Sequence, residues 1–419
     1  MSIENIKKQI RRQISMGVGE SQKLTRAFIQ ERVRRIFEDM RKEKVHHLNL
    51  DSSAIEKIID SLCDDFLGLG PLQKLMEDAE ITEIMVNGPY RIYIEKKGRK
   101  VLSDVKFDDE AHLKYIIEKM LSPTGRRVDE SFPYTDFSLA DGSRVNVIIH
   151  PLTVGGAAVT IRKFLRSIAK VEDLVKLGTM DERMAEFLVA CIRAKVNILF
   201  SGATGSGKTT TLEVLTSYLD HEERIITIED ALELVLNQDH AVRLLTRPPN
   251  IEGKGEISLR DLFRNTLRMR PTRMILGEIR GGEAMDYLQA LNSGHRGCLA
   301  VIHASSPFDT ITRLETMALY AGLNLPSWAI RQQICSGLDL IVQQEQLLDG
   351  SRKLTYITEV GNLQENRIIL KDIFRYEIES VGKDSKVKGT FKAKGVPDFF
   401  PFFKKKGVEI KEDIFIEKG

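Results

Sequence analysis

Residues 196–212 contain the feature that most constrains the fold of this chain. They read VNILFSGATGSGKTTTL, an apolar stretch that leads into a match to the pattern G-x-x-x-x-G-K-[ST]. The apolar stretch predicts a buried strand, and the residues after Lys208 predict a helix, which is the context that the pattern requires. Glycines let such a loop curl until successive N–H groups point inward and cradle phosphate oxygens. The following helix directs the positive end of its dipole at the same anion.

This loop predicts a nucleoside triphosphate site with Mg²⁺. Lys208 is expected to reach the β- and γ-phosphates, and the hydroxyl of Thr209 is expected to hold Mg²⁺. ATP is preferred to GTP because the sequence has no guanine-reading Asn-Lys-x-Asp. The residues expected to contact the nucleotide are Gly202, Ala203, Thr204, Gly205, Ser206, Gly207, Lys208, Thr209 and Thr210.

Acidic residues follow the next two strongly apolar strands and are candidates for orienting or activating water. The first group is Glu229, Asp230 and Glu233, and the second is Glu278. Ligands of an open parallel sheet bind at the carboxyl ends of its strands, so both groups are expected to face the phosphates. The alternative is that they are helix N-terminal acids stabilised by the helix dipole.

The residue before Glu278 departs from the usual pattern. Gly277 stands where a Walker B strand commonly ends in a metal-orienting Asp. We therefore expect Mg²⁺ to rest on Thr209, the phosphates and water, with Glu278 helping through a water.

Periodicity divides the chain into four parts: 1–66, 67–165, 166–378 and 379–419. The first has three helical segments, at about 3–15, 21–44 and 52–66, and the second reads as an α+β domain after the break Gly68-Leu69-Gly70-Pro71. The third alternates strands and helices, which is typical of a parallel sheet covered by helices. The fourth is a tail rich in Gly and Lys, whose aromatic run Phe399–Phe403 is expected to pack against the body.

Composition narrows the class of protein and its partners. Hydrophobic residues make up 42% and charged residues 29%, and the formal net charge is +2. These values are ordinary for a soluble globular protein and give no overall attraction to nucleic acid. No apolar run approaches the roughly 20 residues that span a bilayer, and the N-terminus lacks the apolar stretch of a signal peptide. We expect a cytoplasmic protein that docks at a membrane, if at all, through partners.

Two further patterns bear on partners and metals. The first 47 residues hold 12 Lys and Arg against 6 Asp and Glu. They form either the solvated face of a small helical bundle or a docking module for a membrane platform or acidic lipid. The four cysteines lie far apart without a Cys-x-x-Cys, so we expect no zinc module and interpret them as small buried thiols: Cys63, Cys191, Cys298 and Cys335.

Several blocks outside the loop resemble the secretion ATPases of type II and type IV systems, and most of all the tight-adherence (Tad) pilus assembly ATPases, the CpaF-like group. The blocks read DFLGLGPL, IMVNG, GRRVDES, DGSRVN and TIRKF, and begin at Asp65, Ile84, Gly125, Asp141 and Thr160. Three family signatures also match: an acidic "Asp box" at 228–233, a Walker B with glycine at 274–278, and a "His box" from Gly294 to Pro307.

The resemblance implies an α/β fold with a RecA-like P-loop ATPase domain, preceded by an α+β N-terminal domain and a helical segment. It further implies a ring of six subunits that binds the nucleotide between the two domains and drives an inner-membrane platform of a pilus or secretion system. Glu278 would be the catalytic glutamate and Glu233 its helper, while His303 would couple nucleotide state to the subunit interface.

Basic residues complete the implied site. Arg144 and Arg162 align with family arginines that approach the phosphates, where a guanidinium can stabilise charge that grows on the transferring group. Weaker candidates for contacts are His295, Arg280, Arg126 and Arg127.

Three other functions stay open. A type IV secretion ATPase lacks the zinc module as this chain does. A RecA-like nucleic-acid translocase shares the core but needs a basic channel with stacking aromatic residues, and the ATPase segment shows no such cluster. An ATP-sensing scaffold is disfavoured because Lys208, Thr209, Glu233 and Glu278 occur together.

Overall fold

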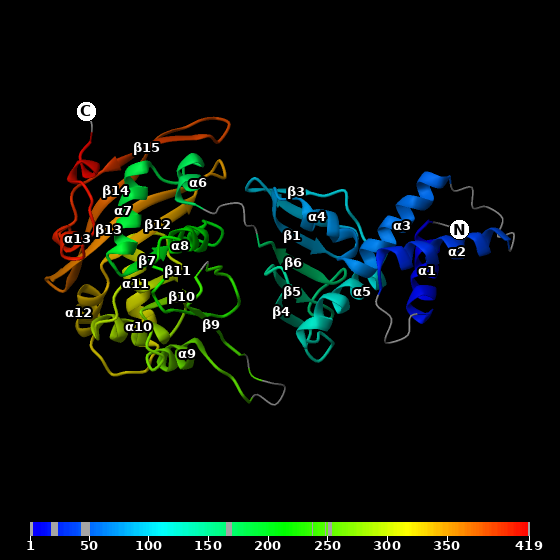
Figure 1. Cartoon of the computed structure of the whole chain (residues 1–419), viewed down its shortest axis with the longest axis horizontal. Coiled ribbons are helices and arrows are strands. Elements are labelled where there is room, and N and C mark those ends of the chain that lie inside the picture. Colours follow the sequence, from blue (N-terminus) through cyan, green and yellow to red (C-terminus); the bar gives the residue numbers. More distant parts are fainter. Residues whose placement is uncertain are drawn as a thin grey trace. The chain divides into compact units, whose positions relative to one another are not determined.

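The computed structural model describes residues 3–17, 24–42, 51–164, 170–236, 238–247, 249 and 254–417. The chain falls into two compact units, Met1–Leu165 and Arg166–Gly419. Figure 1 labels most of their helices and strands. The first unit holds a helical segment and an α+β sheet, and the second holds a parallel sheet covered by helices. This is the predicted fold class.

The first unit opens with three helices that pack together (Figure 1). They are α1 (Ile3–Gly17), α2 (Arg26–Lys42) and α3 (Ser52–Leu67). Apolar residues at helical spacing on each helix form one buried cluster, which includes Ile10, Val33 and Leu62. The carboxylate of Asp51 caps α3 by accepting the N–H of Ala54.

An antiparallel sheet with one long helix follows in the same unit. Its strand order is β3-β2-β1-β6-β5-β4, and α5 supplies Leu113, Ile116 and Ile117 to a core shared with alternate strand residues. The elements are η1 (Gly70–Leu72), α4 (Gln73–Glu77), β1 (Ile81–Asn87), β2 (Ile92–Lys96), β3 (Arg99–Leu102), α5 (Glu110–Leu121), η2 (Ser122–Thr124), β4 (Tyr134–Ser138), β5 (Arg144–Ile148) and β6 (Ala158–Arg162).

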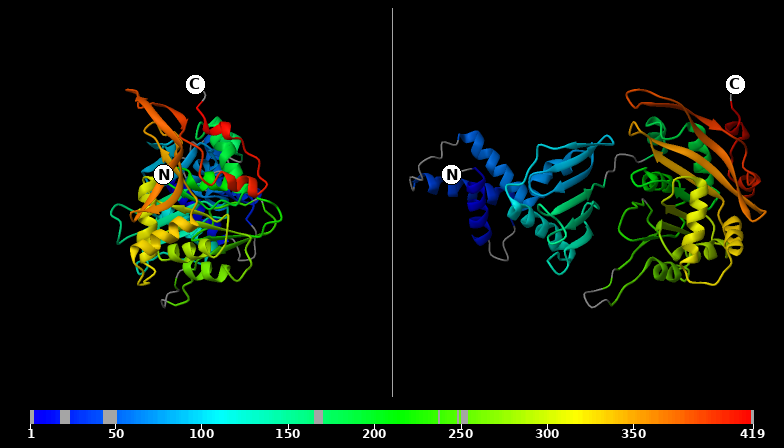
Figure 2. Two further views of the ribbon diagram at one scale, coloured as in Figure 1. Left: turned by 90° about the vertical axis from the view of Figure 1, so that its left-hand side faces the viewer. Right: turned by 180° about the vertical axis from the view of Figure 1, so that it is seen from behind.

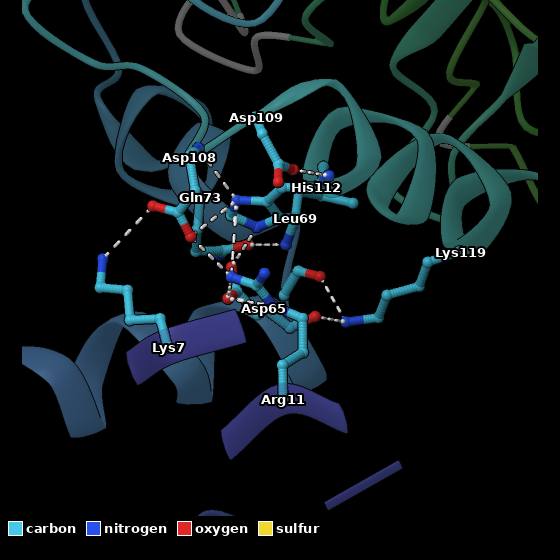
Figure 3. A network of polar contacts seen from close by, with 10 residues as sticks. Lys7, Arg11, Asp65, Leu69, Gln73, Asp108, Asp109, His112 and Lys119 are labelled. Carbon is cyan, nitrogen blue, oxygen red and sulfur yellow. Dashed lines mark hydrogen bonds and ion pairs between the residues drawn. The ribbon is translucent and has the colours of Figure 1, made fainter. Parts of the chain in front are cut away.

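A buried polar network joins the helical segment to this α+β part (Figure 3). Asp65 of α3 is fully buried and accepts hydrogen bonds from Arg11 of α1 at 2.6 Å and from the ring of His112 of α5 at 2.9 Å. Arg11 also contacts Asp108 at 2.9 Å, and Lys119 donates to the carbonyl of Asp65 at 2.8 Å. Buried charges are tolerated only when they are paired in this way, so α1 and α3 are held in one orientation against α5.

The second unit is built on a nine-stranded sheet of order β15-β14-β13-β12-β7-β11-β10-β8-β9. The six strands from β12 to β9 are parallel, and β13 to β15 add as antiparallel strands. The elements are α6 (Val171–Lys176), α7 (Glu182–Arg193), β7 (Ile198–Ser201), α8 (Lys208–Thr216), β8 (Ile225–Glu229), β9 (Ala241–Leu245), α9 (Leu259–Thr266), β10 (Arg273–Ile279), α10 (Glu283–Asn292), β11 (Leu299–Ile302), α11 (Pro307–Leu319), α12 (Ser327–Gly337), β12 (Leu340–Gln346), β13 (Arg352–Gln364), β14 (Arg367–Val381), β15 (Val387–Ala393), α13 (Pro401–Lys405) and η3 (Glu412–Phe415).

Helices cover both faces of this sheet (Figures 1 and 2). Ile198 and Phe200 of the central strand β7 pack with α6, α7 and α8, whereas Leu199 packs with α9 to α12 on the opposite face. Successive residues of a strand point to opposite faces, so a strand buried on both sides must be apolar throughout, as residues 198–200 are.

The C-terminal residues belong to this second unit. The boundary predicted between residues 378 and 379 lies inside β14, and β15 extends the sheet. Phe403 and Phe415 are buried against Phe187 of α7, and the Phe187 and Phe415 ring centroids are 5.4 Å apart. The expectation that the aromatic run packs against the body is confirmed.

Two smaller expectations concern thiols and membranes. Cys63, Cys191 and Cys298 are buried and Cys335 is half-buried, and each is a free thiol. Within the described ranges, every helix is too short or too polar to cross a bilayer.

Candidate functional site

The predicted functional segments of the second unit meet at one edge of the parallel sheet. The phosphate-binding loop follows β7, Glu229 ends β8, Glu278 lies near the end of β10, and His303 follows β11. Because these strands are parallel neighbours, their carboxyl ends lie side by side.

The loop has the backbone conformation that its glycines permit. Gly202, Gly205 and Gly207 have φ of 152°, 78° and 98°, in the region that side-chain-bearing residues rarely adopt. A Cβ at Gly202 would lie 2.1 Å from the carbonyl oxygen of Gln344. Lys208 opens helix α8, is 5% exposed, and donates from Nζ to the carbonyl of Ala203 at 2.7 Å. The loop thus places an ammonium group at the N-terminal end of a helix.

These residues fit a nucleotide phosphate with Mg²⁺. The glycine conformations, the α8 N-terminus and Lys208 form an anion cradle. The Thr209 hydroxyl lies 3.5 Å from Glu233 Oε2, so a hydroxyl and a carboxylate suitable for a hard cation adjoin the cradle. Across the described residues, no cluster of three or more His, Cys, Asp or Glu could hold a metal alone.

Glu229 has a different role from the acids around it. It is 1% exposed, and its Oε2 accepts the backbone N–H groups of Glu233 and Leu234 at 2.8 and 2.9 Å. Its Oε1 accepts the Thr227 hydroxyl at 3.0 Å. Burial raises the pKa of Glu229, and these hydrogen bonds oppose the rise. Glu229 therefore fixes the turn that carries Glu233.

The same contact explains the glycine in the Walker B segment. A Cβ at Gly277 would lie 3.1 Å from Cγ of Glu229, tighter than ordinary van der Waals contact. Gly277 on β10 thus leaves the space that the buried Glu229 of β8 occupies.

Glu278 is bound by two basic side chains. Its carboxylate accepts from Arg280 at 2.7 Å and lies 3.3 Å from Nε2 of His303. Burial raises the pKa of Glu278, but the hydrogen bonds with His303 and Arg280 outweigh it and lower the pKa to about 2. Glu278 is therefore ionised at neutral pH.

Contacts connect Glu278 both to the loop and to the acidic segment. The Nδ1 of His303 lies 3.5 Å from the Thr204 hydroxyl. On the other side, Arg280 lies 3.3 Å from a carboxylate oxygen of Asp230. The structure thus brings together Thr204, His303, Glu278, Arg280 and Asp230 in one chain of polar contacts.

His295 lies elsewhere. It precedes β11, whereas His303 follows it, so the two are at opposite ends of a strand whose four residues span roughly 13 Å. Its Nδ1 lies 3.3 Å from the Ser293 hydroxyl. The structure does not bring His295 to the loop edge.

The predicted arginines of the α+β part belong to the first compact unit. Arg144 and Arg162 are paired directly across β5 and β6. Arg126 donates to the carbonyl of Asp136, and Arg127 lies 3.3 Å from the Asp129 carboxylate. The structure therefore places Arg144 and Arg162 at opposite positions on adjacent strands.

Two residues at the loop were missed by sequence reasoning. Arg352 of β13 donates from Nε to the carbonyl of Gly205 at 2.9 Å, and Gln344 of β12 accepts the Thr211 hydroxyl at 2.8 Å. Both lie more than 130 residues from their partners, outside any local motif. Only the parallel placement of β12 beside β7 could have indicated them.

A phosphate-binding loop on a doubly covered parallel sheet, with acids at the carboxyl ends of the neighbouring strands, defines a P-loop protein with a RecA-like core. Residues 65–374 match the family described as Type II/IV secretion system protein, and the chain belongs to this family.

Individual relatives agree with that assignment. The conjugal transfer protein TrbB of Rhizobium radiobacter is 30% identical over 71% of this chain and 88% of its own length. The type IV secretion system protein VirB11 of Bartonella henselae is 28% identical over 69% of this chain and 91% of its own. The crystal structure of the ATPase DotB of Yersinia pseudotuberculosis covers 75% of this chain and 81% of its own, with a TM-score of 0.50 and 16% identity, which supports the fold alone.

Proposed function

We propose that this protein binds and hydrolyses ATP, with Mg²⁺, and that hydrolysis powers a pilus assembly or secretion system. The observation that carries the proposal is the convergence of Lys208, Thr209, Glu233 and Glu278 at one edge of the sheet. Membership of the Type II/IV secretion system family supports the proposal that hydrolysis powers such a system.

Each residue has a role that follows from its position. Lys208 and the N–H groups of the loop bind the phosphates, and Thr209 holds the cation. Bound Mg²⁺ neutralises charge on the phosphates during transfer. Glu278, ionised because of its basic neighbours, accepts a hydrogen bond from the attacking water and orients it. Glu233, held by the turn around Glu229, lies beside Thr209 and helps to place the cation.

The proposed assembly is a ring of six copies that acts on inner-membrane platform proteins from the cytoplasmic side. In this proposal Arg144 and Arg162 of the α+β part act on the phosphates when the nucleotide is bound. His303, which contacts Glu278, couples the nucleotide state to the interface between subunits. Within this class we favour the Tad pilus motor because the blocks at Gly125, Asp141 and Thr160 resemble that group.

A type IV secretion or conjugation ATPase is the second candidate. The similarity to VirB11 and to the conjugal transfer protein TrbB favours it. A nucleic-acid translocase is a weaker alternative, and DNA binding that falls steeply with salt would support it.

The test is the ATPase rate as a function of protein concentration, with the oligomer mass measured in parallel. We compare the wild type with Lys208→Ala, which removes phosphate binding, and with Glu278→Gln, which removes the water-orienting carboxylate. The proposal expects a rate that rises as six-subunit particles form and is lost in both variants. Equal background rates in all three proteins would favour an ATP-sensing scaffold. A full rate from the monomer would contradict the ring.

A further inference from the structure

The β12–β13 hairpin packs against the glycines of the phosphate-binding loop. A Cβ at Gly207 would lie 2.8 Å from the side-chain nitrogen Nε2 of Gln344 and 3.2 Å from Cδ of Arg352. A Cβ at Gly202 would lie still closer to its neighbour, at 2.1 Å from the backbone carbonyl oxygen of Gln344. The loop therefore lies directly on side chains and backbone from two strands that follow it by more than 130 residues.

Arg352 contacts the loop through a directed hydrogen bond. Its Nε donates to the carbonyl oxygen of Gly205 at 2.9 Å. In a trans peptide the C=O and the next N–H point in opposite directions, so a hydrogen bond to the Gly205 carbonyl also sets the direction of the Ser206 N–H. That N–H lies 3.3 Å from the Ala203 carbonyl, the same oxygen that Nζ of Lys208 contacts. The Ser206 N–H and the Lys208 ammonium are thus both directed at the Ala203 carbonyl oxygen inside the loop.

Gln344 acts on the helix that follows. It is 2% exposed, and its Oε1 accepts the hydroxyl of Thr211, which lies in the first turn of α8. The hairpin therefore contacts both halves of the cradle: Arg352 holds the loop, and Gln344 holds the start of the helix.

We propose that Arg352 is a positioning residue that fixes the orientation of the Gly205–Ser206 peptide, whose N–H meets Nζ of Lys208 at the Ala203 carbonyl. This inference rests on the proposed nucleotide site but assigns a function to a residue on another strand of the sheet. The guanidinium acts from outside the loop, through the carbonyl, and does not touch the phosphates.

The expected effect of losing Arg352 is on affinity. When only a fraction of molecules has the binding-competent loop, the apparent dissociation constant rises in inverse proportion to that fraction. A charged hydrogen bond of this kind changes such a population by about tenfold. Once nucleotide is bound the loop is in the competent state, so turnover at saturation is expected to stay within about twofold of the wild type. We therefore expect KM to rise while kcat stays nearly the same.

The experiment is calorimetric titration of the full chain with Mg-ADP, followed by steady-state ATPase kinetics. Arg352→Met keeps the apolar stem and removes the donor, and Arg352→Lys restores a charged donor. Arg375→Ala is the control, because Arg375 lies over the ring of Tyr356 in the same sheet and is exposed. We expect about tenfold weaker Mg-ADP binding for Arg352→Met, near-wild-type binding for Arg352→Lys, and no change for the control.

Two results would overturn this role for Arg352. One is equal Mg-ADP affinity in Arg352→Met and the wild type while Lys208→Ala binds none. The other is a large fall in kcat at unchanged KM. If Arg352→Met does not fold, Arg352→Gln, which retains a neutral donor, should bind more weakly than Arg352→Lys, and equal affinities of these two would also count against the role. A wild type that binds no Mg-ADP would instead refute the nucleotide site itself.

Discussion

Arg144 and Arg162 lie directly opposite each other on the neighbouring antiparallel strands β5 and β6. Residues in this register project from the same face of the sheet, and like charges placed so are mutually destabilising. Two cationic side chains on one face of the sheet suit an anion, as the proposed contact with phosphate requires.

We expect Arg144→Ala or Arg162→Ala to slow ATP turnover at least about tenfold while Mg-ADP affinity changes less than about threefold. The reason is that charge accumulates on the transferring phosphoryl group chiefly in the transition state. Steady-state kinetics and calorimetric titration check this, with Arg34→Ala, which removes an exposed partner of Glu56, as the comparison from the same unit. Unchanged turnover in both variants would refute the role.

Gly277→Ala tests the spatial relation between β10 and β8. The added methyl would crowd Cγ of Glu229, so this side chain must move by a few tenths of an ångström and weaken its hydrogen bonds to the turn that carries Glu233. We expect the affinity for Mg²⁺, measured in the presence of ADP, to fall several-fold. Gly294→Ala is the control because a Cβ there meets nothing within 4 Å, although its positive φ adds strain of about 1 kcal/mol. Equal Mg²⁺ affinities in the two variants would contradict this account of Gly277.

Local patterns predicted much of this molecule. The loop, the strands before Glu229 and Glu278, and their shared edge follow from apolar runs and from the rule that parallel strands present their carboxyl ends together. The contact of Arg352 with Gly205 was not predictable, because it depends on which strand lies beside β12. The network around Asp65 joins three helices that are separate in sequence, and nothing in each helix alone indicates its partners.

The ion pair between Glu278 and Arg280 predicts that removing Arg280 changes the pH dependence of the ATPase rate. The pKa of Glu278 is lowered to about 2, below its ordinary 4.5, so its ionised form is favoured in the folded protein. This stabilisation is fully present above about pH 4.5 and is lost as pH falls toward 2. In Arg280→Gln the pKa of Glu278 should rise, because burial still raises it while one of the two hydrogen bonds that lower it is lost.

We therefore expect the acidic limb of kcat/KM in Arg280→Gln to move up by about one pH unit or more. Rates measured from about pH 2 to 6 would show this. Arg331→Gln is the control, because Arg331 pairs with Glu315 on helices α12 and α11, away from the loop. An acidic limb that coincides with that of the wild type would mean that Arg280 does not set the protonation of Glu278.

Asp65 is expected to hold the helical segment to the α+β part of the first unit. Removing its charge in Asp65→Asn leaves Arg11 and His112 buried with a weaker acceptor, and breaking a buried charged pair costs about 3 kcal/mol or more. The exposed pair Arg26–Asp60 supplies the matched control, since its loss should cost less than about 1 kcal/mol. Amide hydrogen exchange of α1 in the full chain reports the local opening free energy directly. Asp65→Asn should speed that exchange about a hundredfold and Asp60→Asn less than about fivefold, and equal rates in the two variants would show that the buried network does not anchor α1.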